Sequence, residues 1–212
     1  MYAFEYRRAS SLAEAAELLK ADPDAKLLAG GHTLIPTLKQ RLAQPSMLID
    51  IAGLAELRGI REEDGAIVIG AATRHGEVET SDLVRRRIPA LAELAGKIGD
   101  PQVRNRGTIG GSIANADPAA DWPAAVVGCG ATVRTDRREI AADDFFTGLF
   151  ETALEAGEII REVVFPVPER AAYAKFPNPA SRYAIVGVFV AKFANGVRVA
   201  VTGAGPSVFR VE

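Results

Sequence analysis

The first fifty residues alternate between helical and extended patterns of apolar positions. Ser11 begins a capping-box pattern followed by apolar residues at helical spacing, which predicts a helix over 11–22. Short apolar runs at 26–29 and 47–51 predict buried strands, and residues 33–42 predict a second helix between them. Strands and helices are therefore expected to alternate in this part of the chain.

The middle of the chain predicts more elements of both kinds. Residues 66–72 form an apolar, β-rich run that predicts a strand. Residues 82–98 are amphipathic and predict one helix, which Pro101 closes. Three further elements are expected toward residue 165: a helix at 124–127 and strands at 131–134 and 158–165.

The carboxy-terminal part of the chain is predicted to form a second, mostly β subdomain. Four prolines between residues 166 and 179 mark a boundary region. In an earlier segment, the isolated His75 is expected to face solvent from a helix. The β-rich runs 183–194 and 197–201 flank Asn195-Gly196, the strongest hairpin signal in the chain. An isolated hairpin buries too little apolar surface to be stable by itself. The subdomain is therefore expected either to pack on the first domain or to belong to a truncated chain.

Composition and charge exclude several classes of protein. The chain has 212 residues, 48% of them hydrophobic, and a net charge of −2 without a basic run, so nucleic acid is not an expected partner. The amino terminus lacks an apolar signal segment and the longest apolar runs are too short for a bilayer, which predicts a cytoplasmic protein. Cys129 is the single cysteine, so the chain cannot supply the four thiolates of an iron–sulfur cluster, and any such cluster must lie on another polypeptide. The sequence carries no motif of a metal site or a Ser–His–Asp hydrolase.

Two glycine loops carry the candidate chemistry. In LAGGHTLIP, residues 28–36, a predicted strand is followed by Gly30-Gly31, and Thr33 begins a predicted helix. The second loop, RNRGTIGGSIANADPAAD at residues 104–121, offers the same chemistry. Glycines allow backbone N–H groups to approach a phosphate, and hydroxyls can add to them. Neither loop is a P-loop or a G-x-G-x-x-G motif. The residues thus predict a diphosphate, held from both sides, of a dinucleotide or similar ligand in a non-Rossmann α+β protein.

With these loops and the segments KFPNPASRYAIVGVFVA (175–191) and RVAVTGAGPSVFR (198–210), the sequence resembles the FAD-binding medium subunits of molybdenum hydroxylases, such as aerobic carbon monoxide dehydrogenase and bacterial xanthine dehydrogenase. The resemblance implies an α+β fold. Residues 1–168 would form a PCMH-type, vanillyl-alcohol-oxidase-like FAD-binding domain of two α/β parts. Residues 169–212 would start a carbon monoxide dehydrogenase flavoprotein-like domain with a three-stranded antiparallel sheet, truncated before its helices.

The resemblance also implies the residues around a non-covalently bound FAD. Asp121 would help bind the ribose or phosphate-linked region, Lys175 would lie near the flavin, Ile160 would close the pocket, and Tyr183 would lie against the isoalloxazine ring. His32 would be a loop residue near the phosphates. The pyrophosphate would be held, mostly by backbone amides, at Ala29, Gly30, Gly31, His32, Thr33, Thr108, Ile109, Gly110, Gly111 and Ser112.

The function that the resemblance implies is electron transfer within a complex. Substrate would be oxidised at a molybdopterin centre on a large subunit, and electrons would cross two [2Fe–2S] clusters on a small subunit to reach FAD here. FAD would pass them to a quinone, a cytochrome or NAD⁺. The complex would be a dimer of heterotrimers, and this subunit does not indicate its substrate. Two alternatives are a self-contained flavin oxidase or dehydrogenase and a non-enzymatic phosphate-binding or scaffold module.

Overall fold

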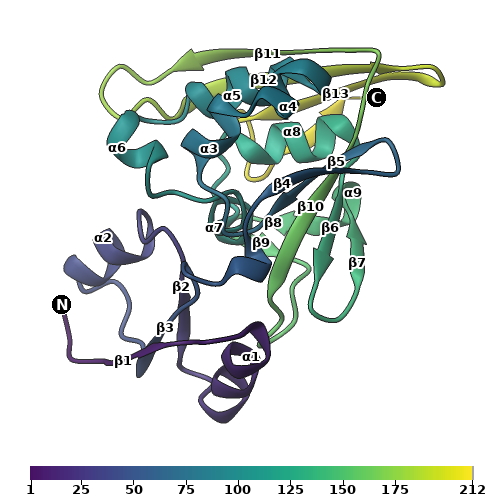
Figure 1. Ribbon diagram of the computed structural model, residues 1–212. Coiled ribbons are helices and arrows are strands. Elements are labelled where there is room, and N and C mark those ends of the chain that lie inside the picture. Colours follow the sequence, from purple (N-terminus) through teal and green to yellow (C-terminus); the bar gives the residue numbers. More distant parts are fainter. Residues whose placement is uncertain (212) are drawn as a thin grey trace.

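A computed structural model describes residues 1–211 of the chain. The amino-terminal unit, at the bottom of Figure 1, is a parallel three-stranded sheet with strand order β1-β3-β2. Helices α1 and α2 connect its successive strands. The elements are β1 (Glu5–Arg8), α1 (Leu12–Ala21), β2 (Lys26–Leu28), α2 (Leu34–Lys39) and β3 (Met47–Asp50).

Both amino-terminal helices form where the sequence predicts them, with differences at their ends. The Ser11 hydroxyl caps α1 by accepting a hydrogen bond from the Glu14 amide at 3.1 Å. The Glu14 carboxylate accepts from the Ser10 amide at 2.7 Å, so the second half of the capping box is displaced by one residue. Helix α2 is shorter than the predicted 33–42, because the chain turns through a left-handed residue, Arg41, with φ of 59°.

The middle unit is built on a five-stranded antiparallel sheet with strand order β4-β5-β10-β6-β7. Its strands are β4 (Ile60–Glu63), β5 (Ala66–Gly70), β6 (Thr132–Thr135), β7 (Glu139–Ala141) and β10 (Ile160–Pro166), with a small ribbon of β8 (Phe146–Gly148) and β9 (Glu151–Thr152). Its helices are the 3-10 turn η1 (Ala55–Leu57), α3 (His75–Thr80), α4 (Asp82–Arg87), α5 (Pro89–Gly96), α6 (Pro101–Arg104), α7 (Ile109–Asn115), α8 (Trp122–Cys129) and α9 (Ala142–Phe145).

The single helix predicted over 82–98 is wrong, because α4 and α5 are separate helices. The chain leaves helical geometry at Ile88, with φ −140° and ψ 72°, and Pro89 starts α5. Proline has no amide hydrogen for a continuous helix and clashes with the preceding turn, but it suits the first position of a new one. Pro101 likewise begins α6.

The carboxy-terminal unit is a four-stranded antiparallel sheet in which β11 (Arg170–Pro177), β12 (Ala184–Phe193), β13 (Gly196–Thr202) and β14 (Phe209–Val211) pair in sequence order. The predicted hairpin is present as β12 and β13. Its Phe193–Gly196 pair places Ala194 and Asn195 in the turn, and Gly196 has φ of 145°. Strand β11 was not predicted, and the sheet has one more strand than the resemblance implied. As an edge strand, β11 tolerates Pro177 at its end.

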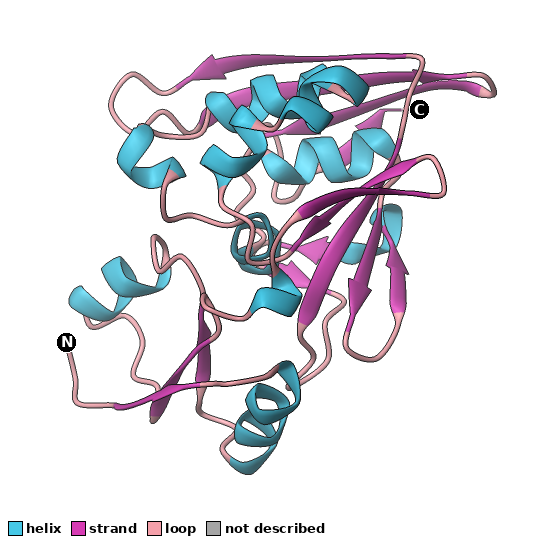
Figure 2. Cartoon of the chain, viewed as in Figure 1, coloured by secondary structure: helices cyan, strands magenta, loops and turns pink. Residues whose placement is uncertain are grey.

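The carboxy-terminal sheet packs on the middle unit through a shared core. All of α8 is buried, and it contacts β12 and β13. Figures 1 and 2 show this helix lying along the carboxy-terminal sheet. Trp122 on α8, Phe165 on β10 and Phe189 on β12 are fully buried in one cluster, and burying each such side chain contributes about 1.5–3 kcal/mol. Residues 169–211 therefore share a core with the residues before them, while the domain boundary at 168 stays a prediction.

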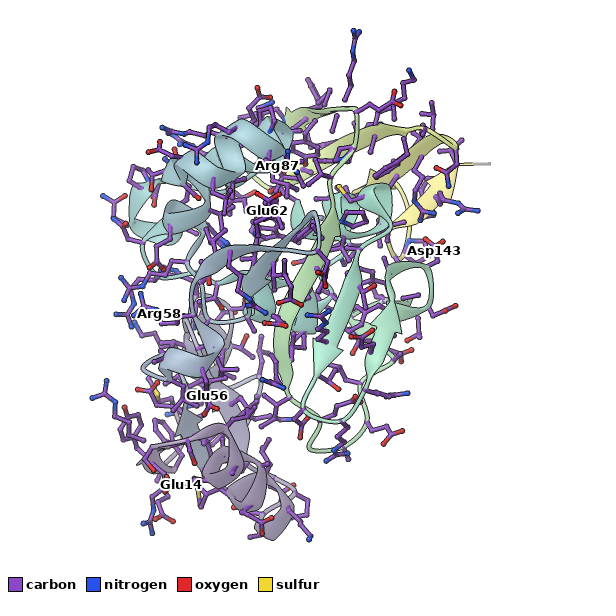
Figure 3. All side chains as sticks on the ribbon, turned by 45° about the vertical axis from the view of Figure 1, so that its right-hand side comes forward. Glu14, Glu56, Arg58, Glu62, Arg87 and Asp143 are labelled. Atoms are coloured by element: carbon purple, nitrogen blue, oxygen red, sulfur yellow. The ribbon has the colours of Figure 1, made fainter. Side chains whose placement is uncertain are left out.

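Ion pairs at the surface add a second link between these units. Asp143 on α9, labelled in Figure 3, accepts hydrogen bonds from Arg198 on β13 and, at 3.1 Å, from Arg210 on β14. Arg198 also donates to the Val127 carbonyl of α8 at 2.9 Å. The guanidinium groups of the sheet thus lie against α8 and α9.

Candidate functional site

A cavity of about 610 Å³ lies where the amino-terminal and middle units meet, and both glycine loops line it. Its volume falls within the usual range for small-molecule sites, about 300–1,000 Å³. Twelve of the fourteen predicted site residues line it: Ala29, Gly30, Gly31, His32, Thr33, Thr108, Gly110, Gly111, Ser112, Asp121, Ile160 and Tyr183. Ile109 and Lys175 do not.

The two glycine loops touch each other because Gly30 has no side chain. A Cβ at Gly30 would lie 2.2 Å from the Arg106 carbonyl oxygen and 2.8 Å from the Gly107 Cα. Gly31 has φ of 73°, a left-handed conformation that glycine adopts without strain. These glycines therefore join the loops, which lie more than seventy residues apart in the sequence, into one wall of the cavity.

The first loop carries backbone amides that the protein itself does not use. Within residues 1–211, the amides of Gly30, Gly31, His32 and Thr33 donate no hydrogen bond, and all four residues line the cavity. A run of such N–H groups forms a concave site for an anion. The first loop is therefore able to bind an anion, and the diphosphate itself stays a prediction.

The second loop uses its amides differently from the prediction. The Ile109 amide donates to the Thr73 carbonyl at 3.1 Å, and the Gly110 amide donates to the Ala71 carbonyl at 2.9 Å. The Gly111 amide donates to the Thr108 hydroxyl at 3.2 Å. Ile109 itself is fully buried in the core. These bonds fix the loop in place and occupy the amides of Ile109, Gly110 and Gly111, so these three amides are not free to bind a ligand.

Gly110 and Gly111 have different structural roles. A Cβ at Gly110 would lie 2.5 Å from the Ala71 Cβ, so this glycine is required for packing. A Cβ at Gly111 would meet only the Thr108 hydroxyl, at 3.0 Å, and Gly111 is exposed on the cavity wall. The missing side chain at Gly111 thus keeps the cavity open.

Asp121 and Lys175 bind each other in the structure. The Lys175 ammonium donates to the Asp121 carboxylate at 2.9 Å and to the Lys97 carbonyl at 2.9 Å. The second carboxylate oxygen accepts from the Tyr173 hydroxyl. The side chains of Lys175 and Asp121 are only 3% and 5% exposed. Lys175 thus holds the Asp121 side chain at the wall of the cavity, and contact of either residue with a cofactor stays a prediction.

Burial controls the protonation of this cluster. It raises the pKa of Asp121, while the nearby Lys175 ammonium and the Tyr173 hydroxyl act in the opposite direction. Burial, followed by the charge and hydrogen bond of Asp121, raises the pKa of Tyr173. Tyr173 therefore stays a neutral donor to the carboxylate at any physiological pH.

The expectation that His75 faces solvent is wrong. The His75 side chain is 4% exposed, and its Nδ1 accepts a hydrogen bond from the Trp122 indole at 3.0 Å. Burial, followed by the nearby charges of His32 and Arg104, lowers the pKa of His75 to about 4. Its only hint in the sequence is the apolar Val78 three residues later, which shares the buried face of α3.

Tyr183 and Ile160 lie on the far wall of the cavity. Ile160 starts β10 and is buried, whereas Tyr183 precedes β12 and is 44% exposed. The neighbouring Arg182 has φ of 62°, and its amide donates to the Asn178 carbonyl at 2.9 Å, so a tight turn presents the tyrosine. A half-exposed ring of this kind can stack on a planar ligand.

Sequence reasoning missed several residues that line the cavity. Besides His75, the lining includes the small residues that follow β5 and a group of polar residues from three separate loops. They are Ala71, Ala72, Asn115, Asp117, Glu158, Ser181 and Arg182. Only the second glycine loop, which ends at Asp121, gave a signal in the sequence for some of these residues.

Two classes of site are not seen in the part of the chain that the structure describes. No group of three or more His, Cys, Asp or Glu residues in it could hold a metal ion. No helix among residues 1–211 is both long and apolar enough to cross a membrane.

Comparisons with known proteins agree with this geometry. A family model described as the FAD binding domain in molybdopterin dehydrogenase matches residues 2–168. The chain is 43% identical to the carbon monoxide dehydrogenase medium chain of Hydrogenophaga pseudoflava, over 99% of this chain and 77% of that one. It is 38% identical to the glyceraldehyde dehydrogenase medium chain of Sulfolobus acidocaldarius, over 89% of this chain and 69% of that one.

Solved structures confirm the expected fold. The carbon monoxide dehydrogenase of Hydrogenophaga pseudoflava, in a form that lacks the Mo-pyranopterin moiety of its cofactor, aligns with a TM-score of 0.93 at 43% identity. The alignment covers 99% of this chain and 77% of that chain. The chain therefore belongs to the family of FAD-binding domains of molybdopterin dehydrogenases.

Proposed function

We propose that this chain is the FAD-binding electron-transfer subunit of a molybdenum hydroxylase. The observation that carries the proposal is the run of four open amides at Gly30–Thr33, in a cavity that the second glycine loop completes. Such a run suits the diphosphate of FAD. When bound, FAD supplies the redox chemistry, and the protein supplies binding and orientation.

The residues of the cavity divide the binding of FAD among them. The first loop would bind the diphosphate through its amides, and the second loop would add the hydroxyls of Thr108 and Ser112. Tyr183 would stack against the flavin ring, which contributes about 0.5–1.5 kcal/mol beyond the area buried. Ile160 would add an apolar contact. Asp121, held by Lys175 and Tyr173, would help bind the ribose or phosphate-linked region.

The electron path runs through partner subunits. A large subunit would hold the molybdopterin centre that oxidises substrate, and a small subunit would hold two [2Fe–2S] clusters that supply electrons to FAD, from which an external acceptor would take them. The relatives carry names with different substrates, carbon monoxide and glyceraldehyde. This difference supports placing substrate choice on another subunit. A cytoplasmic location stays a prediction.

We expect FAD to be bound non-covalently. His32 lies in the first loop, whose amides would hold the diphosphate, so its side chain would lie near the phosphates and not beside the flavin ring. Acid precipitation of the purified holoprotein is therefore expected to release all flavin into the supernatant. Yellow colour that stays in the pellet would contradict this and make His32→Ala the next variant to measure.

The decisive experiment for the complex is co-expression with an iron–sulfur subunit and a molybdenum subunit. We expect size-exclusion chromatography to show a dimer of heterotrimers, and substrate to reduce the FAD in single-turnover absorbance measurements. The lone subunit, mixed with the same substrate, is expected to show no reduction. A lone subunit that oxidises an organic substrate would favour a self-contained flavin enzyme, and a protein that stays colourless with FAD would favour a scaffold.

A further inference from the structure

His75 lies at the junction of the two glycine loops. Its amide donates to the Gly107 carbonyl at 2.9 Å, and a Cβ at Gly107 would lie 2.7 Å from the His75 Nε2. Gly107 in turn packs against Gly30 of the first loop. The absence of a side chain at Gly107 therefore lets the His75 ring pack against the second loop, where that loop meets the first.

The contact with Trp122 determines which ring nitrogen carries the proton. An indole N–H can only donate, so the His75 Nδ1, 3.0 Å from the Trp122 Nε1, must be the acceptor. The neutral ring then carries its hydrogen on Nε2. Burial keeps the ring neutral, with a pKa of about 4. His75 is thus an uncharged donor of defined direction.

The Nε2–H has no acceptor within the protein. Among residues 1–211 it makes no hydrogen bond, although every enclosed side-chain nitrogen and oxygen there has a partner. Nε2 is therefore open to the cavity that His75 lines. A nearly buried donor without a partner is costly, so an acceptor is expected from the ligand.

We infer that the Nε2–H of His75 donates a hydrogen bond to an oxygen of the diphosphate bound between the glycine loops. The inference rests on the proposed FAD site and adds to it a side-chain donor that neither glycine motif contains. Trp122 is a positioning residue, because it holds the tautomer without touching the ligand.

The test compares the full-length apoprotein with its His75→Phe and His75→Gln variants. Phenylalanine fills the site without a donor, whereas glutamine keeps an N–H group at similar reach. Dissociation constants are measured for FAD, for ADP, which retains the diphosphate, and for adenosine, which lacks it. We expect His75→Phe to weaken FAD and ADP by about tenfold or more, the loss of one hydrogen bond to a charged acceptor. Adenosine affinity is expected to stay unchanged, and His75→Gln to recover part of the loss.

A second measurement does not depend on the variants folding. In ¹⁵N-labelled wild-type protein, the His75 Nε2–H resonance is expected to shift and to exchange more slowly with water when ADP is added. An unchanged resonance, or a folded His75→Phe protein with wild-type affinity for FAD and ADP, would overturn the role of His75 alone. A wild-type protein that binds neither ligand would sink the proposed FAD site as well.

Discussion

Gly111→Val is expected to abolish FAD retention while the protein stays folded. The added side chain projects into the cavity, because a Cβ at Gly111 meets only the Thr108 hydroxyl at 3.0 Å. It would keep the diphosphate from the wall, and losing two hydrogen bonds to a charged group weakens binding by about 100-fold or more. Flavin per protein after purification and the dissociation constant of FAD measure the effect.

Gly111→Ala and Gly110→Ala serve as matched controls. Gly111→Ala adds only the Cβ and is expected to weaken FAD binding less than valine does, with the melting temperature unchanged. Gly110→Ala is expected to lower the melting temperature instead, because its Cβ would lie 2.5 Å from the Ala71 Cβ. Normal flavin content in a folded Gly111→Val protein would remove this loop from the site.

Lys175→Met is expected to destabilise the folded apoprotein by about 3–5 kcal/mol near pH 7.5, because it leaves the buried Asp121 carboxylate without its cation. Urea unfolding without FAD measures this loss. Lys192→Met is the matched control. Its ammonium also pairs with a carboxylate at 2.9 Å, that of Glu169, but both side chains are about half exposed, so little stability should be lost. Equal losses in the two variants would contradict a buried ion pair.

The loss in Lys175→Met is expected to shrink as the pH falls toward 5. Burial raises the pKa of Asp121 in the folded protein, and removal of Lys175 takes away the main opposing charge. A carboxyl with a folded-state pKa above its unfolded value destabilises the fold when ionised, so protonation at lower pH restores stability. Asp121→Asn combined with Lys175→Met should remove this pH dependence, since the amide oxygen still accepts from Tyr173.

Local signals in the sequence were sufficient for several elements. The Ser11 cap and the apolar positions after it define α1 within a few residues, and Asn195-Gly196 marks the β12–β13 hairpin. Both depend on contacts between near neighbours. The break at Pro89 was also visible in the sequence, but the continuous apolar face across it suggested one helix. The edge strand β11 was hidden by the prolines around it.

The glycine motifs predicted segments that line the cavity, yet only the tertiary structure decided how each glycine acts. Gly30 and Gly110 are required because distant backbone and side-chain atoms pack against them, whereas Gly111 faces open space. Three successive amides of the second loop, those of Ile109, Gly110 and Gly111, donate within the protein, whereas the four successive amides of Gly30 to Thr33 do not. No spacing rule contains this information, since it depends on which segments meet.

The sequence by itself marked the two glycine loops as candidate binding segments and, through the resemblance that its short motifs carry, gave the family, the α+β class and the cofactor that the family binds. The tertiary structure decided the states of the polar groups. His75 is neutral and buried because Trp122, far along the chain, covers it, and Asp121 is paired because β11 brings Lys175 and Tyr173 to it. Burial and partners control protonation and hydrogen bonding, and both are properties of the folded chain.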